Sequence, residues 1–173
     1  MGNLADDKRR LGMYYSAEYD SPLGKLLIVS DGEAVCRVSF QDKEDVSSSK
    51  YQSDDDLAIF RDVRKWFDDY FKGKNPQINF KLNPKGTEFR LRVWEMLREI
   101  KYGETVTYGE IASRISPSMS SQAVGGAVGH NPIAIIIPCH RVLGAKGKLT
   151  GYAGGIDRKI ELLKLEKATF LSQ

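Results

Sequence analysis

Residues 106–128 constrain the fold of this chain more than any other segment, because their pattern predicts two short helices joined by a turn. Thr107 and Glu110 have the spacing of a capping box, in which each side chain accepts a backbone hydrogen bond at a helix start. The first helix should end at the break Ser116-Pro117-Ser118, and the second should cover residues 120–128. Two short helices joined by a tight turn are typical of a helix-turn-helix motif.

We expect residues 86–173 to form one C-terminal module around this motif. Apolar residues at helical spacing predict a helix from Thr87 to about Ile100. The glycine- and lysine-rich segment Gly144–Lys148 is predicted to be a β-hairpin, which would be the wing of the motif. A last helix is expected from about Asp157, with inward-facing Ile160, Leu163 and the stem of Lys167.

Residues 1–85 have the pattern of a separate, smaller module that mixes helix and strand. Two apolar runs, 25–30 and 34–40, flank the turn signal Asp31-Gly32 and predict a hairpin. Around it we expect β structure over 13–40, a helix over 57–72, a polar loop over 41–56 and a linker over 74–86.

The strongest candidate for chemistry is Cys139, which lies directly before His140. The apolar run Ile133–Ile137 before it is interpreted as a buried strand, so the thiol would stand at a strand end. A thiolate is the reactive form, and a nearby base must raise its fraction at neutral pH. The alternative is a buried structural thiol beside a loop histidine.

His140 cannot simply bond to Cys139 side chain to side chain, because neighbours on an extended segment point to opposite sides. Either a turn brings them together or a water bridges them, and His140 then serves as an indirect general base. Such a base needs an orienting acceptor. Glu161 and Glu166 of the last helix are the candidates.

Composition narrows the classes of function. No apolar run is long enough for a membrane helix, and the N-terminus lacks a signal-peptide pattern. Two cysteines make no disulfide framework, so a cytoplasmic location is expected, with Cys36 as a core residue. No zinc-ligand spacing links Cys36, Cys139, His130 and His140, so neither a metal nor another cofactor is expected.

The net charge of +3 is concentrated in residues 85–173, whereas acidic residues outnumber basic ones in residues 1–84. A polyanionic partner would therefore meet the C-terminal half. The second predicted helix carries Ala123-Val124-Gly125-Gly126-Ala127, although helices that read bases usually project Arg, Asn, Gln or Lys. These small residues permit either tight helix packing or close approach of the backbone to a DNA groove.

Five motifs follow one another in residues 86–167: Gly103-Glu104 with Tyr108, Ala123–Ala127, Asn131-Pro132, Pro138-Cys139-His140-Arg141-Val142 and Gly151-Tyr152-Ala153-Gly154-Gly155. In these motifs, and more loosely at Ser21-Pro22-Leu23-Gly24, the chain resembles the O6-alkylguanine-DNA alkyltransferase family. This resemblance implies an α+β fold: an N-terminal ribonuclease H-like α/β domain over 1–85 and a C-terminal winged helix-turn-helix-type alkyltransferase domain over 86–173.

The resemblance implies a suicide DNA-repair protein. Cys139 would take the alkyl group from O6-alkylguanine, and from O4-alkylthymine, after the base is flipped out of duplex DNA bound through its minor groove. His140 would act on the thiol through a water, and Glu166 would orient His140. The implied protein is a monomer without cofactor, cytoplasmic, and nucleoid-associated if its source is bacterial.

Further roles follow from the same resemblance. It implies that Asn131 braces the turn before the nucleophile, Tyr108 rotates the nucleotide and the Val142 carbonyl accepts from the guanine amino group. Tyr152 and Ala153 would line the pocket. DNA contacts are expected from Gln122, Ala123, Gly125, Gly126 and Arg141.

Two positions depart from the family pattern. Gln122 stands where an arginine normally fills the stack left by the flipped base, which predicts weaker DNA binding or slower capture of that base. Ala134 stands where a proline is common, which predicts a looser pocket wall. The N-terminal zinc ligands of some members are absent. The alkyltransferase-like proteins that bind lesions without repair lack the cysteine, so Cys139 argues against that branch.

Two other functions stay open on the residues alone. A cysteine hydrolase built on Cys139 and His140 would turn over repeatedly on an ester or an amide. A winged-helix regulator would bind DNA without any chemistry.

Overall fold

The computed structural model describes residues 13–43 and 47–171, and the chain divides into two compact units on either side of the Asn83–Pro84 bond. No helix in these described ranges is long and apolar enough to cross a lipid bilayer.

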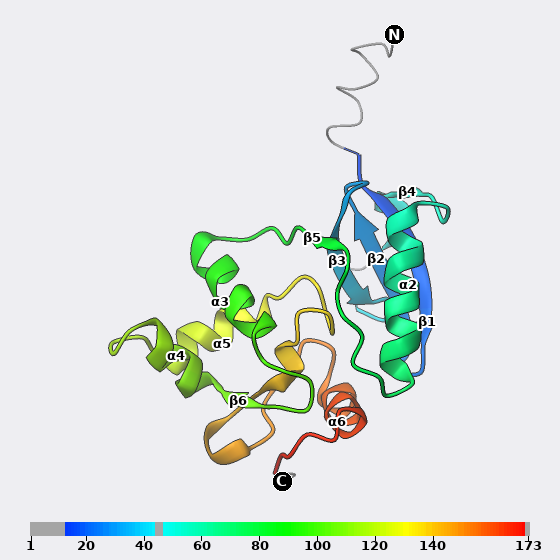
Figure 1. The fold of residues 1–173 in the computed structure, drawn as a ribbon. Coiled ribbons are helices and arrows are strands. Elements are labelled where there is room, and N and C mark those ends of the chain that lie inside the picture. Colours follow the sequence, from blue (N-terminus) through cyan, green and yellow to red (C-terminus); the bar gives the residue numbers. More distant parts are fainter. Residues whose placement is uncertain (1–12, 44–46, 172–173) are drawn as a thin grey trace. The chain divides into compact units, whose positions relative to one another are not determined.

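The N-terminal unit is a five-stranded sheet of order β4-β1-β2-β3-β5, with one long helix against one face (Figure 1). Antiparallel pairing joins β1 to β2 and β2 to β3, whereas β4 and β5 pair in parallel with β1 and β3 at the two edges. The elements are β1 (Tyr15–Ser21), β2 (Gly24–Ser30), β3 (Ala34–Phe40), η1 (Ser48–Lys50), β4 (Gln52–Ser53), α2 (Ala58–Phe71) and β5 (Lys81–Leu82).

The helix α2 forms because its apolar residues recur on one face, and that face is buried. Its buried side chains are Ile59, Phe60, Val63, Trp66, Phe67 and Tyr70. The central strand β2 is buried almost throughout, which agrees with its continuous apolar sequence. The expected hairpin and helix are therefore confirmed, and Cys36 is buried in β3 as predicted.

The two edge strands were not predicted. β4 lies in the segment 41–56 expected to be a loop, and β5 lies in the expected linker 74–86. Each has two residues, which is too short for an alternating pattern to show in the sequence. Their backbone conformation is set by pairing with β1 and β3, a tertiary contact.

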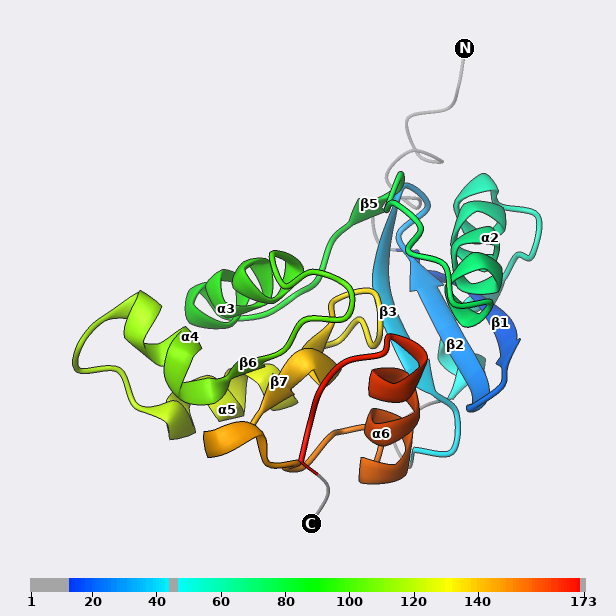
Figure 2. The same cartoon turned by 60° about the horizontal axis from the view of Figure 1, so that its bottom comes forward.

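Over its described residues 84–171, the C-terminal unit has four α-helices and a two-stranded parallel sheet (Figure 2). Trp94 of α3 donates its indole N–H to the Ala127 carbonyl of α5 over 2.8 Å, which ties these two helices together. The elements are α3 (Glu88–Arg98), β6 (Val106–Thr107), α4 (Tyr108–Ile115), α5 (Ser121–Gly129), η2 (Cys139–Arg141), β7 (Val142–Leu143), η3 (Ala145–Gly147) and α6 (Ile156–Leu165).

Helices α4 and α5 are the predicted helix-turn-helix, and the capping box at the start of α4 is confirmed. Thr107 Oγ1 accepts from the Glu110 N–H over 3.1 Å, and a Glu110 carboxylate oxygen accepts from the Thr107 N–H over 2.6 Å. Ser120 caps α5 in the same manner, through the Ala123 N–H.

The prediction of a β-hairpin wing over Gly144–Lys148 is wrong. Gly144–Lys148 is a tight loop around η3, in which Lys146 and Gly147 have φ values of 60° and 78°. The Gly144 N–H donates to the Lys148 carbonyl over 2.8 Å, but no paired strands flank this loop within the described part of the unit. A hairpin fails to form because β7 pairs with β6, while Lys148 forms a bridge with Leu171.

The predicted start of the last helix is confirmed to within one residue, but the prediction that Lys167 faces inward is wrong. Lys167 is exposed and has a φ of 56°, beyond the end of α6. Leu163 is buried as expected, and the buried lysine of this helix is Lys159.

We expect Thr107→Ala to lower the free energy of unfolding by about 1 kcal/mol, because the change leaves the Glu110 N–H without its cap. Urea denaturation followed by circular dichroism measures the effect. Ser113→Ala is the matched control: its hydroxyl is exposed on the same helix, and the change should move the midpoint little. Equal losses in the two variants would contradict the assigned role of the cap.

Candidate active site

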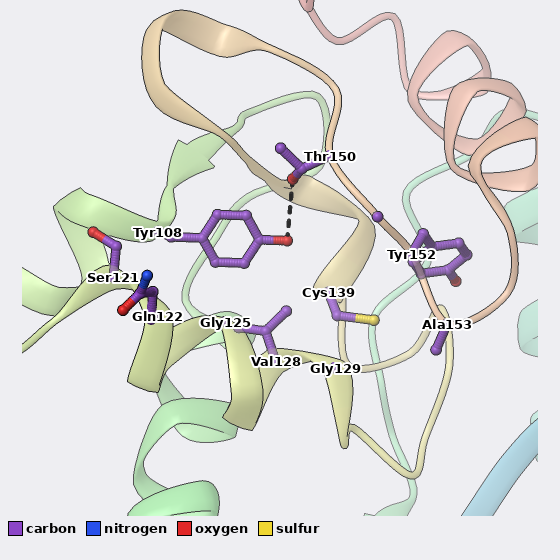
Figure 3. Close-up of a pocket in the computed structure, with 11 residues that line it drawn as sticks. Tyr108, Ser121, Gln122, Gly125, Val128, Gly129, Cys139, Thr150, Tyr152 and Ala153 are labelled. Carbon is purple, nitrogen blue, oxygen red and sulfur yellow. Dashed lines mark hydrogen bonds between the residues drawn. The ribbon is translucent and has the colours of Figure 1, made fainter.

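A pocket of about 530 Å³ opens beside the helix-turn-helix of the C-terminal unit (Figure 3). One side is formed by α4 and α5, and the other by the segment from Thr150 to Ala153. Cys139 lies in its wall. The lining residues are Tyr108, Ser121, Gln122, Gly125, Val128, Gly129, Cys139, Thr150, Gly151, Tyr152 and Ala153.

The apolar run Ile133–Ile137 that leads to Cys139 is a series of turns, so the predicted buried strand is wrong. Ile135 has a φ of 69°, and the Ile137 N–H donates to the Ile133 carbonyl over 3.1 Å. The side chain of Asn131 makes hydrogen bonds that a neighbouring strand would otherwise make. It accepts from the Ile133 N–H over 3.0 Å and donates to the Ile137 carbonyl over 2.8 Å. Its amide thereby satisfies backbone groups that are buried away from water.

Cys139 is the first residue of η2, and only 7% of its surface is exposed. Asn131 Nδ2 lies 3.1 Å from its sulfur and donates to it, and Figure 3 shows the sulfur directed toward Tyr152. Burial raises the pKa of the Cys139 thiol, while the Asn131 hydrogen bond and the charge of Lys159 act in the opposite direction. The resting thiol is therefore protonated at neutral pH, and the chemistry requires a base.

His140 and Glu166 form a fully buried pair, with 2.8 Å between Nε2 and Oε1. Burial lowers the pKa of His140 although Glu166 raises it, so the ring is neutral at pH 7. A carboxylate at Nε2 favours the tautomer with its proton there, which leaves a lone pair on Nδ1. Nδ1 is buried and has no hydrogen-bond partner among the described residues.

Of the two carboxylates considered from the sequence, Glu166 reaches His140, whereas Glu161 is exposed and pairs with Lys164 over 3.3 Å. Burial acts to raise the pKa of Glu166, but the hydrogen bonds and charges of His140 and Arg141 hold it well below its usual range. The Gly103 N–H also lies 3.4 Å from this carboxylate.

Arg141, expected to contact DNA, binds the buried carboxylate of the site, and its DNA contact stays a prediction. Its guanidinium binds both oxygens of Glu166 over 2.8 and 2.9 Å and donates to the Ile100 carbonyl over 2.6 Å. It also lies over the ring of Tyr102, 5.9 Å from the centroid. The side chain of Arg141 therefore holds the buried carboxylate of Glu166 in place.

The other expected DNA contacts lie on α5. Gln122, Ala123 and Gly126 are exposed, and Gln122 also lines the pocket. A Cβ on Gly126 would meet nothing within 4 Å, whereas one on Gly125 would lie 3.8 Å from the ring of Tyr108. On this face of α5, at the rim of the pocket, the small side chains leave the helix backbone accessible.

Within the pocket, the Thr150 hydroxyl donates to the Tyr108 hydroxyl over 3.4 Å (Figure 3). The Tyr152 hydroxyl is buried without a hydrogen-bond partner among the described residues, and burial raises its pKa well above the ordinary value. Ala153 is exposed at the rim. The Val142 carbonyl, expected to accept from guanine, accepts from Lys159 Nζ over 2.6 Å.

Sequence reasoning missed Lys159 and Thr150. Thr150 directly precedes the motif Gly151-Tyr152-Ala153-Gly154-Gly155, and that position was the signal for it. Lys159 precedes Leu162 and Leu163 by three and four residues, so helical spacing placed it on their buried face. That signal was overlooked because lysine is usually exposed.

Within residues 13–43 and 47–171, no three His, Cys, Asp or Glu side chains are placed to hold a metal ion.

Two family models match the chain. The 6-O-methylguanine DNA methyltransferase, ribonuclease-like domain covers residues 13–84, and the 6-O-methylguanine DNA methyltransferase, DNA binding domain covers residues 88–168. The methylated-DNA–protein-cysteine methyltransferase of Haemophilus influenzae is 46% identical over 162 residues, which cover 93% of this chain and 90% of that protein. The Methanosarcina acetivorans protein of the same name is 48% identical over 157 residues, 89% of this chain and 98% of that protein.

Solved structures agree. The Mycobacterium tuberculosis O6-methylguanine methyltransferase superposes with a TM-score of 0.80 at 43% identity, covering 90% of this chain and 93% of that chain. A structure of the M. tuberculosis protein in complex with DNA gives the same TM-score and identity, covering 90% and 92%. The resemblance drawn from the sequence motifs is confirmed, as is the pairing of a ribonuclease-like domain with a helical DNA-binding domain. The chain belongs to the 6-O-methylguanine DNA methyltransferase family.

Proposed function

We propose that this protein repairs DNA by moving the alkyl group of O6-alkylguanine onto the sulfur of Cys139. The observation that carries the proposal is a buried thiol in a pocket wall beside a helix-turn-helix, with Asn131 on its sulfur and a neutral His140 held by Glu166. The family's relatives are named for this reaction, and one has been solved bound to DNA.

The reaction is one displacement. The thiol proton passes through a bridging water to His140 Nδ1, the buried lone pair without a protein partner. The thiolate then forms a carbon–sulfur bond as the carbon–oxygen bond of the lesion breaks, and the guanine leaves with that electron pair and takes up one proton. The thioether is stable, so each molecule acts once.

The substrate base must leave the duplex to reach Cys139, at a cost of a few kcal/mol. The exposed small residues of α5, Ala123 and Gly126, allow its backbone to approach the minor groove closely. Tyr108 and Tyr152 then flank the base. O4-alkylthymine is a second substrate in this proposal. The protein acts as a monomer in the cytoplasm, where its two free cysteines remain reduced.

Incubation with a duplex that carries O6-methylguanine tests the proposal. Peptide mapping by mass spectrometry should find one methyl group per protein, on Cys139, and unmodified guanine in the DNA. If Cys139 carries no methyl group after the incubation has run to completion, the proposal is wrong. Repeated turnover on an ester or an amide at the same thiol would instead indicate a hydrolase, and DNA binding without any methylation would indicate a regulator.

We expect Gln122→Arg to strengthen binding to the damaged duplex, or to speed methyl transfer, by about threefold to tenfold. Arginine adds a charge for the phosphates and a planar group that stacks in place of the flipped base. Fluorescence anisotropy and single-turnover transfer measure the two quantities. Gln52→Arg, an exposed position in the N-terminal unit, controls for net charge. If Gln122→Arg changed neither quantity, the deficit assigned to Gln122 would be wrong.

A further inference from the structure

Lys159 is a lysine without exposed surface in a protein that has few buried charges. It lies on α6, and its ammonium donates to the Val142 carbonyl over 2.6 Å and to the Thr150 carbonyl over 3.3 Å. Lysine is almost never fully buried unless it is paired with a carboxylate. Among the described residues, no carboxylate pairs with Lys159, so this charge needs another explanation.

The two carbonyls belong to two different segments of the site. Val142 directly follows η2, which carries Cys139, and Thr150 begins the segment that lines the pocket as far as Ala153. One ammonium therefore holds these two segments at a fixed separation. Because a carbonyl oxygen has two lone pairs, that of Val142 retains one for a substrate amino group.

The hydrogen bond to Val142 holds the ammonium of Lys159 three residues along the backbone from Cys139, and its charge acts to lower the pKa of that thiol. His140 of η2 is neutral, the hydroxyl of Tyr152 stays protonated, and the charge of Glu166 is paired with Arg141. Burial lowers the pKa of Lys159 to about 8, while the charge of Cys139 acts to raise it. The amine is therefore mostly protonated at pH 7, and an ammonium near a sulfur favours the thiolate.

We propose that Lys159 is a positioning residue for the transfer, which fixes the backbone of both segments and supplies the positive charge that favours the Cys139 thiolate. The inference rests on the proposed function of Cys139 as the alkyl acceptor. It gives a reason for a buried cation without a carboxylate: the partner of this charge is the thiolate that forms at the moment of reaction.

The test uses the whole protein and a reagent that needs no DNA. Iodoacetamide labelling of Cys139, followed by mass spectrometry of its peptide between about pH 6 and pH 10, gives the rate as a function of pH. Lys159→Met keeps the length of the side chain and removes its charge. We expect the midpoint of the profile to rise by about one pH unit, so that the rate at pH 7 falls about tenfold while the plateau at high pH is unchanged. Lys164→Met, an exposed position on the same helix, should leave the midpoint where it is.

A merely structural role gives a different result. Lys159→Met would then melt at a lower temperature with an unshifted midpoint, and that outcome overturns the proposal. Lys159→Gln covers the case in which the methionine variant does not fold, because its amide still donates to one carbonyl; a folded Gln variant with an unshifted midpoint overturns the proposal equally. Failure of the wild-type protein to take methyl from DNA would overturn the proposed function, and it is measured separately from these profiles.

Discussion

Cys139→Ser is expected to abolish methyl transfer, with a rate on the order of 10³-fold or more below that of the wild type. A serine hydroxyl keeps the shape of the site and the hydrogen bond from Asn131, but it does not ionise near neutral pH and is a far weaker nucleophile. Binding to the damaged duplex should stay within about twofold, because the Asn131 turn and α5 are left intact. Single-turnover loss of methyl from labelled duplex and fluorescence anisotropy measure the two quantities.

Cys36→Ser is the control for this experiment. Cys36 is also a buried free thiol, but it lies in β3 of the N-terminal unit. Its replacement should leave the transfer rate unchanged. Near-normal transfer by Cys139→Ser, or loss of transfer in Cys36→Ser alone, would contradict the assignment of the acceptor.

The parts of the fold that the sequence predicted well are those with local causes. The capping box joins Thr107 to Glu110, three residues apart, so its pattern is readable without any tertiary information. The strands over 25–30 and 34–40 flank a turn, so their antiparallel pairing is also a local feature, although the register shifts between Val29 and Ser30. Long periodic segments such as α2 also carry their burial in their own sequence.

The errors arise at positions where a side-chain hydrogen bond or ion pair decides the structure. The run Ile133–Ile137 is as apolar as a buried strand, and the only sign against that reading is Asn131, whose side chain replaces the partner strand. The resemblance implied a DNA contact for Arg141, and the local sequence does not show that its guanidinium binds Glu166, twenty-five residues away. Lys159 is buried for the same kind of reason. The pairing of His140 and Arg141 with Glu166, in particular, is encoded by no local pattern.

Glu166→Gln is the second change with a large expected effect, on both stability and rate. The carboxylate binds His140 and Arg141 with its side chain fully buried. Removing its charge leaves the guanidinium of Arg141 without a counter-ion, which should lower the free energy of unfolding by about 3–5 kcal/mol. The transfer rate should fall on the order of 10²-fold, because an amide no longer favours the tautomer with the free lone pair on Nδ1.

The pH dependence of this stability difference has a definite sign. The folded-state pKa of Glu166 lies well below its usual range, so its contribution is fully present above about pH 4.3, the pKa of an unfolded glutamate. The contribution is lost as the pH falls toward the folded-state value. The gap between wild type and Glu166→Gln in urea denaturation should therefore be widest near neutral pH and should narrow below about pH 4. A gap that is constant with pH would contradict an ionised Glu166.

Glu161→Gln is the control for Glu166→Gln, because it removes one negative charge near the end of the chain and leaves the buried carboxylate intact. Glu161 lies on α6, the helix that leads to Glu166, and its carboxylate is exposed with a surface ion pair to Lys164. Such a pair contributes at most about 1 kcal/mol, so the Gln variant should keep the stability, the rate and the pH profile of the wild type. Transfer is measured at a temperature where urea denaturation shows that both variants are folded, so that a slow Glu166→Gln protein reports on His140 and not on unfolding. If both variants lost rate equally, the orientation of His140 by Glu166 would have no role in the reaction, and Nδ1 would not be its base.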